Sequence, residues 1–298
     1  MPEQLLCYQR SVLETAKDLG AFSVQHLQEA GSWAHLQVRQ GRVCLRFVDQ
    51  TGTSLSEHAL GAESNAELTV PPAVLHRIEA LSQEFTIEVS RYCKPHRYFE
   101  KKYQLSNVHD DLLSAYVHSL RDHSLNRILD IGCGSGRNLL FLAKMGHAVT
   151  GVENKSEKLE RIEAIARQEG LDDITLLNHD LHERLPFAGG EFDAVVATVA
   201  LQFLKPERID SLLSELGEET AAGGFHFFVF PVASEIFSYP ANFSFLPTRD
   251  ELFHWYQDRG WAVIDYRVNN GQLTKRGADG KPIQGQFATL LAQKLPAP

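Results

Sequence analysis

Hydrophobic and polar residues alternate along the front third of the chain, from about residue 32 to residue 92. Clear examples are residues 33–41, 42–52 and 85–93, and glycines and a Pro-Pro pair punctuate the runs. Alternation with a period of two places every second side chain on the same face of a strand. The pattern therefore predicts short antiparallel strands that form a β-sandwich or a small barrel.

A second pattern starts near residue 95, where continuous apolar runs alternate with amphipathic segments. The runs predict strands at residues 127–132, 148–153, 174–180, 192–203 and 225–232, and helices at 137–146, 155–170, 206–220 and 248–260. Apolar strands followed by amphipathic helices are typical of a parallel sheet that is covered on both faces. The back of the chain is thus predicted to be an α/β domain with a Rossmann-like sheet.

The change of pattern divides the chain into a β-rich domain, residues 1–94, and an α/β domain, residues 95–298. Near the end, Asn270-Gly271 and Asp279-Gly280 each predict a hairpin turn. Residues 286–294 then form the expected last, antiparallel strand.

A glycine turn follows the first strand of the α/β domain. Asp130 ends an apolar run, and Gly132, Gly134 and Gly136 follow at alternate positions before a helical pattern begins. Such a turn lets a ligand lie against bare backbone. A nicotinamide fingerprint would need a further glycine where Arg137 stands. The Asp-x-Gly-x-Gly-x-Gly pattern instead resembles motif I of the class I S-adenosylmethionine (SAM)-dependent methyltransferases.

Acidic and polar residues also end the next three predicted strands, and ligands of open α/β sheets bind beyond such strand ends. Glu153 ends the second strand, where it could accept both ribose hydroxyls of a nucleoside, and Asn154 follows it. Asp180-Leu181 ends the third and could contact an adenine ring. Thr198 lies on the fourth, beneath the expected sulfonium. Together these positions predict a SAM site.

Composition excludes several other functions. The chain has 298 residues and a formal net charge of -9, and its basic residues are scattered, which argues against nucleic-acid binding. It begins with no signal pattern, and no apolar run reaches the roughly 18 residues of a membrane span, so a cytoplasmic protein is expected. The four cysteines share no metal-type or redox-type spacing and are expected to be free buried thiols. No metal site is predicted; His35, His58 and His76 are expected to be structural.

Residues 99–113, 129–155, 195–204 and 287–294 together resemble the tellurite-resistance methyltransferase (TehB-type) family, and residues 70–82 with the strand ending in Tyr92-Cys93 resemble the β-rich domain of its long members. The resemblance implies a class I methyltransferase sheet preceded by an antiparallel β-domain. It also implies methyl transfer from SAM to oxyanions of tellurium or selenium. The front domain could bind the small-molecule substrate, mediate formation of a homodimer, or do neither.

One region departs from this family. Where the family carries a His-Arg pair thought to face the substrate, this chain has Thr274 and Lys275, with Arg276 adjacent, and a further family arginine is replaced by Gln286. Lysine and arginine are not equivalent where an oxyanion requires two parallel hydrogen bonds. Lys275 and Arg276 could still attract an anion, but the methyl acceptor stays open.

Three further residues are candidates for the site by resemblance. His109 belongs to a helix expected to cover the cofactor, and Tyr98 and Tyr103 belong to the segment before it. His109 is a candidate catalytic group, and the tyrosines could contact the methionine carboxylate of SAM. Either a soft oxyanion or a small organic thiol, amine or hydroxyl compound would suit as acceptor. A SAM-binding sensor without turnover is the third hypothesis.

Overall fold

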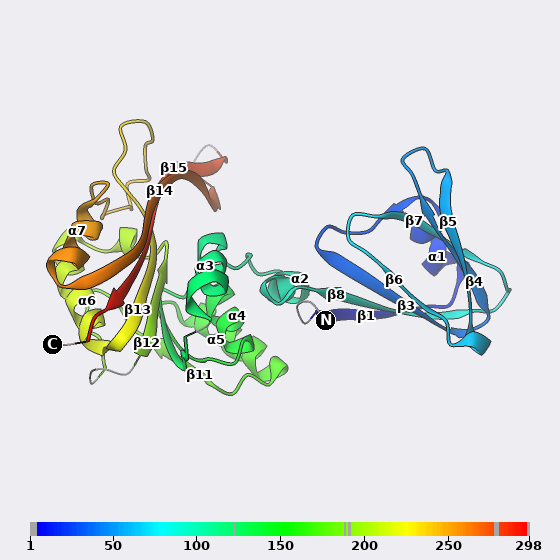
Figure 1. Ribbon diagram of the computed structural model, residues 1–298, viewed down its shortest axis with the longest axis horizontal. Coiled ribbons are helices and arrows are strands. Elements are labelled where there is room, and N and C mark those ends of the chain that lie inside the picture. The colour runs from blue at the N-terminus through cyan, green and yellow to red at the C-terminus, as the bar shows by residue number, and fades with distance from the viewer. Residues whose placement is uncertain (1–4, 122, 188, 190–191, 277–279, 297–298) are drawn as a thin grey trace. The chain divides into compact units, whose positions relative to one another are not determined.

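The computed structural model describes residues 5–121, 123–187, 189, 192–276 and 280–296. The chain divides into two compact units, Met1–Ser106 and Asn107–Pro298. Their elements are shown in Figure 1. Each unit has its own hydrophobic core, and each is described separately.

The first unit is a sandwich of two antiparallel sheets, as the alternating pattern predicts. One sheet contains, in spatial order, β1 (Leu6–Leu13), β8 (Thr86–Cys93), β3 (Ser32–Gln40) and β6 (Glu67–Val70). The other contains β2 (His26–Leu27), β7 (Leu75–Ala80), β4 (Arg42–Val48) and β5 (Ser54–Gly61). The unit also includes α1 (Ala16–Ser23) and α2 (Tyr98–Tyr103). Inward-facing side chains of both sheets, among them Leu36, Leu45 and Ile87, share one core, so the sandwich prediction is confirmed.

The second unit is built on one sheet of seven strands. Their spatial order is β11 (Ile174–Asn178), β10 (Ala148–Glu153), β9 (Arg127–Ile131), β12 (Phe192–Thr198), β13 (Thr220–Pro231), β15 (Pro282–Lys294) and β14 (Trp261–Arg276). The first five run parallel, and β15 is antiparallel to both β13 and β14. The α/β prediction and the antiparallel last strand are therefore confirmed.

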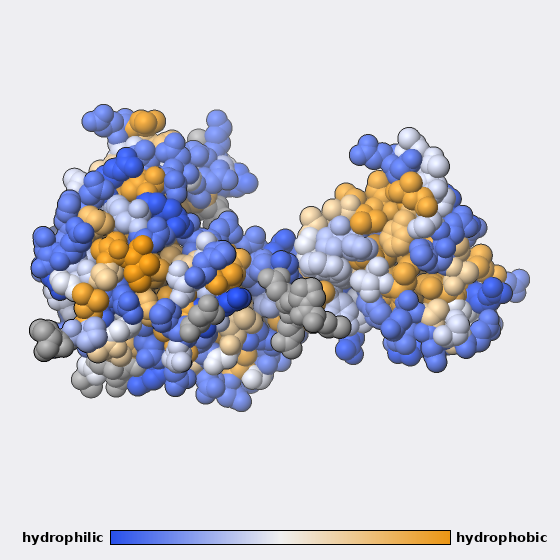
Figure 2. Space-filling view, in the orientation of Figure 1, coloured by the Kyte–Doolittle hydropathy of each residue, from blue (hydrophilic) through white to orange (hydrophobic). Residues whose placement is uncertain are grey.

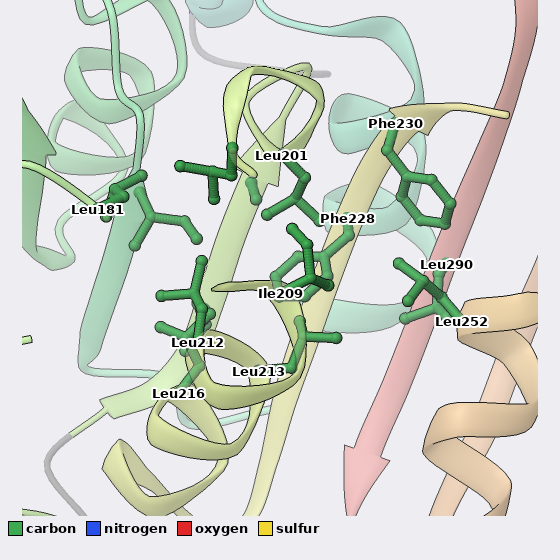
Figure 3. Close-up of a cluster of buried hydrophobic side chains, with 14 of the residues drawn as sticks. Leu181, Leu201, Ile209, Leu212, Leu213, Leu216, Phe228, Phe230, Leu252 and Leu290 are labelled. Atoms are coloured by element: carbon green, nitrogen blue, oxygen red, sulfur yellow. The ribbon is translucent and has the colours of Figure 1, made fainter. Parts of the chain in front are cut away.

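Helices cover both faces of this sheet (Figure 1). The unit contains α3 (Asp110–Ala115), α4 (Arg137–Lys144), α5 (Ser156–Glu169), α6 (Pro206–Glu219) and α7 (Glu251–Asp258). Leu212, Leu213 and Leu216 of α6 are fully buried and pack with Phe228 of β13 and Leu252 of α7 in one cluster (Figure 3). This packing holds the sheet in place, and the sheet positions the carboxyl ends of its parallel strands.

The prediction of a hairpin turn at Asn270-Gly271 is wrong. β14 passes straight through both residues, with Asn270 opposite Gln286 and Gly271 opposite Gly285. A Cβ on Gly271 would lie 3.2 Å from the Phe287 ring, so this glycine accommodates a cross-strand aromatic side chain. The strands β14 and β15 stay paired as far as Arg276, which lies opposite Pro282. Of the turn predicted at Asp279-Gly280, Asp279 lies outside the described residues, and Gly280 adopts a positive φ of 73°.

Both units expose some large hydrophobic side chains. In the view of Figure 2, apolar areas occur among polar ones on both units. The large exposed hydrophobic side chains of the second unit are Phe203, Ile236, Ile264 and Leu295. The large exposed hydrophobic side chains of the first unit are Val12, Val24, Leu27, Leu55 and Leu81. A small unit buries a smaller share of its surface, so this exposure is in keeping with its size. None of the helices in the described part of the chain is long and apolar enough to cross a membrane.

The cysteine prediction is correct for three of the four residues. Cys44, Cys93 and Cys133 are free and buried, whereas Cys7 is free and only partly buried. Within the described residues, no cluster of three or more histidine, cysteine or acidic side chains could hold a metal ion.

Candidate active site

The strand order of the second unit reverses at β9. From β9 the chain proceeds to β10 and β11 on one side, and then returns to β12 on the other side. In open α/β sheets, ligands bind beyond the carboxyl ends of the strands at such a point. The polar residues predicted from the sequence lie at or just beyond the carboxyl ends of β9, β10, β11 and β12, which the fold brings to one edge.

The glycine turn has a distinct requirement at each position. Gly132, Gly134 and Gly136 have positive φ values of 65°, 59° and 83°. A Cβ on Gly132 would lie 2.6 Å from the Ala200 Cβ, and one on Gly136 would lie 2.7 Å from a side-chain carbon of Ile162. A Cβ on Gly134 would meet no atom closer than the Gly132 oxygen at 3.9 Å. Packing therefore excludes a side chain at two positions, while Gly134 faces open space.

Asp130 lies beneath this turn with an unusual electrostatic environment. It is 1% exposed, and its Oδ2 has no hydrogen-bond partner in the described part of the protein. Burial raises the pKa of the Asp130 carboxyl to about 7, although the charge of Arg137 and the Leu139 N–H both act to lower it. A buried, unpartnered carboxyl oxygen favours a ligand that brings a positive group.

Arg137, the first residue of α4, carries a positive charge that acts on Asp130. Burial lowers the pKa of its guanidinium, and the negative charges of Asp130 and Asp110 oppose this shift. It makes no side-chain hydrogen bond or ion pair within the described residues. Sequence reasoning used Arg137 only to exclude a nicotinamide fingerprint and did not assign it a role; its position directly after the last glycine was the available signal.

Glu153 ends β10 and is 8% exposed. Its Oε2 accepts hydrogen bonds from the Gly134 N–H and from the Lys158 Nζ, each at 3.1 Å. The carboxylate thus lies directly beside the glycine turn, as the spacing from Asp130 suggested. Asn154 follows it on the surface.

Asp180 and Leu181 follow β11. Asp180 is exposed and accepts hydrogen bonds from the backbone N–H of His182 at 3.0 Å and from its ring at 2.9 Å, and these bonds lower the pKa of its carboxyl. Leu181 is buried, and its side chain belongs to the core cluster of this unit (Figure 3). Asp180 is therefore available at the surface, whereas Leu181 packs in the core that supports the sheet.

Asn138 joins three elements of the site, and sequence reasoning did not single it out. Its Nδ2 donates to the Thr198 hydroxyl at 2.8 Å, and its Oδ1 accepts from the His109 N–H at 3.1 Å. This amide is 3% exposed. It ties the end of β12 and the segment before α3 to the first turn of α4. Its place next to Arg137 was the available sequence signal.

The residue after Thr198 has a strained backbone. Val199 adopts a φ of 57°, a conformation that is rare for a β-branched side chain and costs about 1–3 kcal/mol. Two hydrogen bonds hold it: its N–H donates to the Val229 oxygen at 2.7 Å, and its oxygen accepts from the Gln202 Nε2 at 2.8 Å. Strain of this kind gathers at functional sites, which fits the end of β12.

His109 is the N-cap of α3, and its Nδ1 accepts a hydrogen bond from the Asp111 N–H at 3.3 Å. Burial, with a smaller effect of Arg137, lowers the pKa of this imidazole to about 4. Asp111 accepts hydrogen bonds from Arg267 of β14 at 2.8 Å and from Thr289 of β15 at 3.0 Å. The helix that carries His109 is thereby fixed to the last two strands.

The remaining predicted residues are placed as follows. Tyr98 and Tyr103 are the ends of α2 in the first unit, where both rings pack on Phe99. Lys275, like Thr274, lies on β14, and its side chain lies outside what the structure describes. Arg276 is exposed and donates to the Gly280 oxygen at 2.6 Å. Gln286 donates to the Asn270 side chain at 3.3 Å.

The strand order, the open glycine turn and the polar strand ends define the class of protein: the second unit has the fold and site of a SAM-dependent methyltransferase. The chain belongs to the TehB family. Residues 91–291 match the family described as tellurite resistance protein TehB, and residues 20–89 match the TehB-like domain.

Similar proteins span nearly the whole chain. A probable S-adenosyl-L-methionine-dependent methyltransferase TehB of Haemophilus influenzae (strain 10810) is 31% identical over 99% of this chain and all of its own length. Hemagglutinin 1 of Eikenella corrodens is 30% identical over 90% of this chain and 86% of its own length. The crystal structure of TehB from Haemophilus influenzae has a TM-score of 0.89 and 30% identity, covering 99% of this chain and 100% of that chain.

Proposed function

We propose that this protein transfers a methyl group from SAM to a small, soft nucleophile, namely an oxyanion of tellurium or selenium. The observation that carries the proposal is a pair of opposite charges beside the open glycine turn: Asp130, whose buried Oδ2 has no described hydrogen-bond partner, and Arg137. The amino-acid end of SAM carries one ammonium and one carboxylate, so the pair complements it in charge. The match to TehB proteins along the full chain supports the same reaction.

The residues around the turn fit SAM one group at a time. The unpartnered Asp130 oxygen suits the ammonium, and the guanidinium of Arg137 suits the carboxylate, since such pairs form charge-assisted hydrogen bonds. Gly134 leaves the backbone open to the ligand. The carboxylate of Glu153 suits the ribose hydroxyls. Bound SAM supplies a methyl group that its sulfonium already activates.

The protein's part in such a transfer is orientation rather than proton abstraction. Holding two reactants in line can supply on the order of 7–11 kcal/mol. A catalytic base works best when its pKa lies near the working pH, and the pKa of His109 is about 4. His109 is therefore a weak base that suits a positioning role. A soft anion needs no base, which favours an oxyanion over an alcohol.

A second acceptor class has its own supporting observation. Gln286 stands where the family resemblance implies an arginine, and its amide bonds to the neutral Asn270 side chain. A neutral edge of the site would suit a small organic thiol or amine better than an anion. This alternative keeps SAM and changes only the acceptor.

Headspace analysis distinguishes the two acceptors. We expect the full-length protein with labelled SAM to release labelled dimethyl telluride or dimethyl selenide when it is given tellurite or selenite together with excess dithiothreitol. The added thiol is the reductant, because tellurium or selenium must be reduced on the way from the oxyanion to the dimethyl product. We expect this release because a soft anionic nucleophile reacts without a base. The Asp130→Asn variant is the control and should release at least tenfold less, since it weakens SAM binding. Labelled product from a thiol, with none from either oxyanion, would instead establish the organic acceptor.

The affinity for SAM should rise with pH. Because burial raises the pKa of Asp130 to about 7, the carboxyl is largely protonated at pH 6 and ionised at pH 8. Only the ionised form attracts an ammonium, so the dissociation constant should fall by up to about tenfold per pH unit below pH 7 and then level off. Isothermal titration between pH 6 and 8 measures this.

Asp130→Asn is again the matched variant, because it keeps the shape and removes the titration. Its weaker binding should be independent of pH over the same range. A wild-type affinity that does not change with pH would contradict the role of Asp130.

A further inference from the structure

The sandwich of the first unit has one polar end between its sheets. Inward-facing positions of a sandwich are ordinarily apolar, and here Leu36, Val38 and Ile87 follow that rule. Farther along the same inward faces, polar residues replace the apolar ones. We call the following inward-facing side chains the polar end: Ser11 of β1, His26 of β2, His58 of β5, His76 of β7 and Arg91 of β8.

Strand register shows that these side chains point inward. Arg91 lies opposite Ala34, which belongs to the core, and is separated by two and four residues along β8 from the core residues Val89 and Ile87. His76 lies opposite His26 on one neighbouring strand and opposite Phe47 on the other, and Phe47 packs on the core.

Arg91 is the charged member of the polar end. Its described side-chain hydrogen bond goes to the Ser11 hydroxyl at 3.3 Å, and it forms no ion pair within the described residues. Two outward-facing arginines of the same unit do pair with carboxylates: Arg39 with Glu88 at 2.8 Å, and Arg46 with Glu57 at 2.7 Å. Arg91 thus faces inward without a countercharge among the described residues.

Two of the histidines are cross-strand neighbours, and the charge of Arg91 acts on one of them, His26. The rings of His26 and His76 are 5.1 Å apart, edge to face. Burial, followed by the charge of Arg91, lowers the pKa of His26, and burial lowers the pKa of His76. The His76 Nδ1 donates its ring N–H to the Val74 oxygen at 3.3 Å, whereas the described residues offer no hydrogen-bond partner to the ring N–H of neutral His26. His58 lies opposite Leu45 of β4, and its ring packs on Phe47 with centroids 5.6 Å apart.

The surroundings favour an anion over a metal ion. The inward-facing positions of the described strands carry no aspartate or glutamate, and no metal-ligating cluster of three occurs among the described side chains. Glu29, whose charge acts on Tyr8 at this end of β1, is paired with Lys101. Arg91 and His26 are partly exposed, so solvent reaches them.

We propose that the polar end binds a small oxyanion, either an inorganic one or a carboxylate, with the Arg91 guanidinium as its charged donor and the ring N–H of His26 as a neutral donor. An arginine fork matches the planar or tetrahedral oxygens of such ions. The site lies wholly within the first unit and does not depend on the function proposed for the second.

The test uses the full-length protein with labelled histidine rings at a fixed pH of about 7.5, above the ordinary histidine pKa. Sodium sulfate and sodium acetate are titrated separately, and the ring resonances of His26, His58 and His76 are followed by NMR. We expect saturable shifts with a dissociation constant below roughly 10 mM for at least one ion. The ion that binds more tightly identifies the inorganic or the carboxylate class.

Arg91→Gln should weaken this binding at least about tenfold. Arg39→Gln is the matched control, because it removes an outward-facing arginine from the same sandwich, and it should change the affinity less than about twofold. Arg91→Lys, which keeps the charge and loses the fork, should give an intermediate affinity and covers the case in which Arg91→Gln does not fold. Absence of saturable shifts with both ions, or equal weakening by the Arg39 variant, overturns the proposal.

Discussion

Gly134→Val is expected to reduce the affinity for SAM by at least about 100-fold, equivalent to about 2.7 kcal/mol. A side chain at this position meets no protein atom closer than 3.9 Å, so it would project into the space that we assign to the ligand. Its positive φ of 59° adds a backbone cost of about 1–2 kcal/mol for any L-residue. Isothermal titration with SAM measures the loss of affinity.

Gly170→Val is the matched control for backbone strain. Gly170 ends α5 with a φ of 61°, and no atom lies within 4 Å of the position of its Cβ. The two variants should therefore lose similar stability, while only Gly134→Val loses affinity for SAM. If both variants bound SAM as the unchanged chain does, the glycine turn would not be the cofactor site.

Tyr256→Phe is expected to lower the free energy of unfolding by about 1–3 kcal/mol, because it leaves a buried acceptor without a donor. The Thr220 hydroxyl donates to the Leu216 oxygen at 2.6 Å, so it accepts from the His226 Nε2 at 2.8 Å. The His226 Nδ1 must then accept from the Tyr256 hydroxyl at 2.6 Å. All of these side chains are fully buried, and burial lowers the pKa of His226 to about 3.

Urea denaturation of a double-mutant cycle checks this prediction. Removing both partners, Tyr256 and His226, with phenylalanine at each position leaves no unsatisfied acceptor, so the double variant should lose less stability than the sum of the single variants. The expected difference is about 0.5–3 kcal/mol. Additive losses of stability would show that the hydrogen bond between Tyr256 and His226 has no coupling energy.

Local sequence patterns predicted the main architecture correctly. Alternating residues between 32 and 92 formed the sandwich, and the apolar runs of the back half formed the parallel strands. The glycine turn could be located because it depends on neighbouring residues alone: an apolar strand, glycines at alternate positions and a helix start. Asp130 and Glu153 could be paired from spacing, because consecutive parallel strands end at the same edge.

The last two strands were harder to predict. Residues 261–276 were not predicted as a strand, and a turn was predicted inside them at Asn270-Gly271. An Asn-Gly pair favours a tight turn by its backbone preference. Here the pairing of β14 with β15 outweighs that preference. Gly271 has no side chain and so leaves room for the Phe287 ring. Such pairing depends on residues far away in the sequence.

The sequence by itself therefore determined the class of each domain and the residues of the glycine turn, because these follow from local periodicity and backbone freedom. Only the tertiary structure decided which polar groups lack partners. Asp130 stands out in the sequence, but its burial and its unpartnered Oδ2 do not, and Arg137 and Arg91 look like ordinary charged residues. The significance of all three depends on burial and on which partners the described residues supply, and both are set by contacts between distant segments.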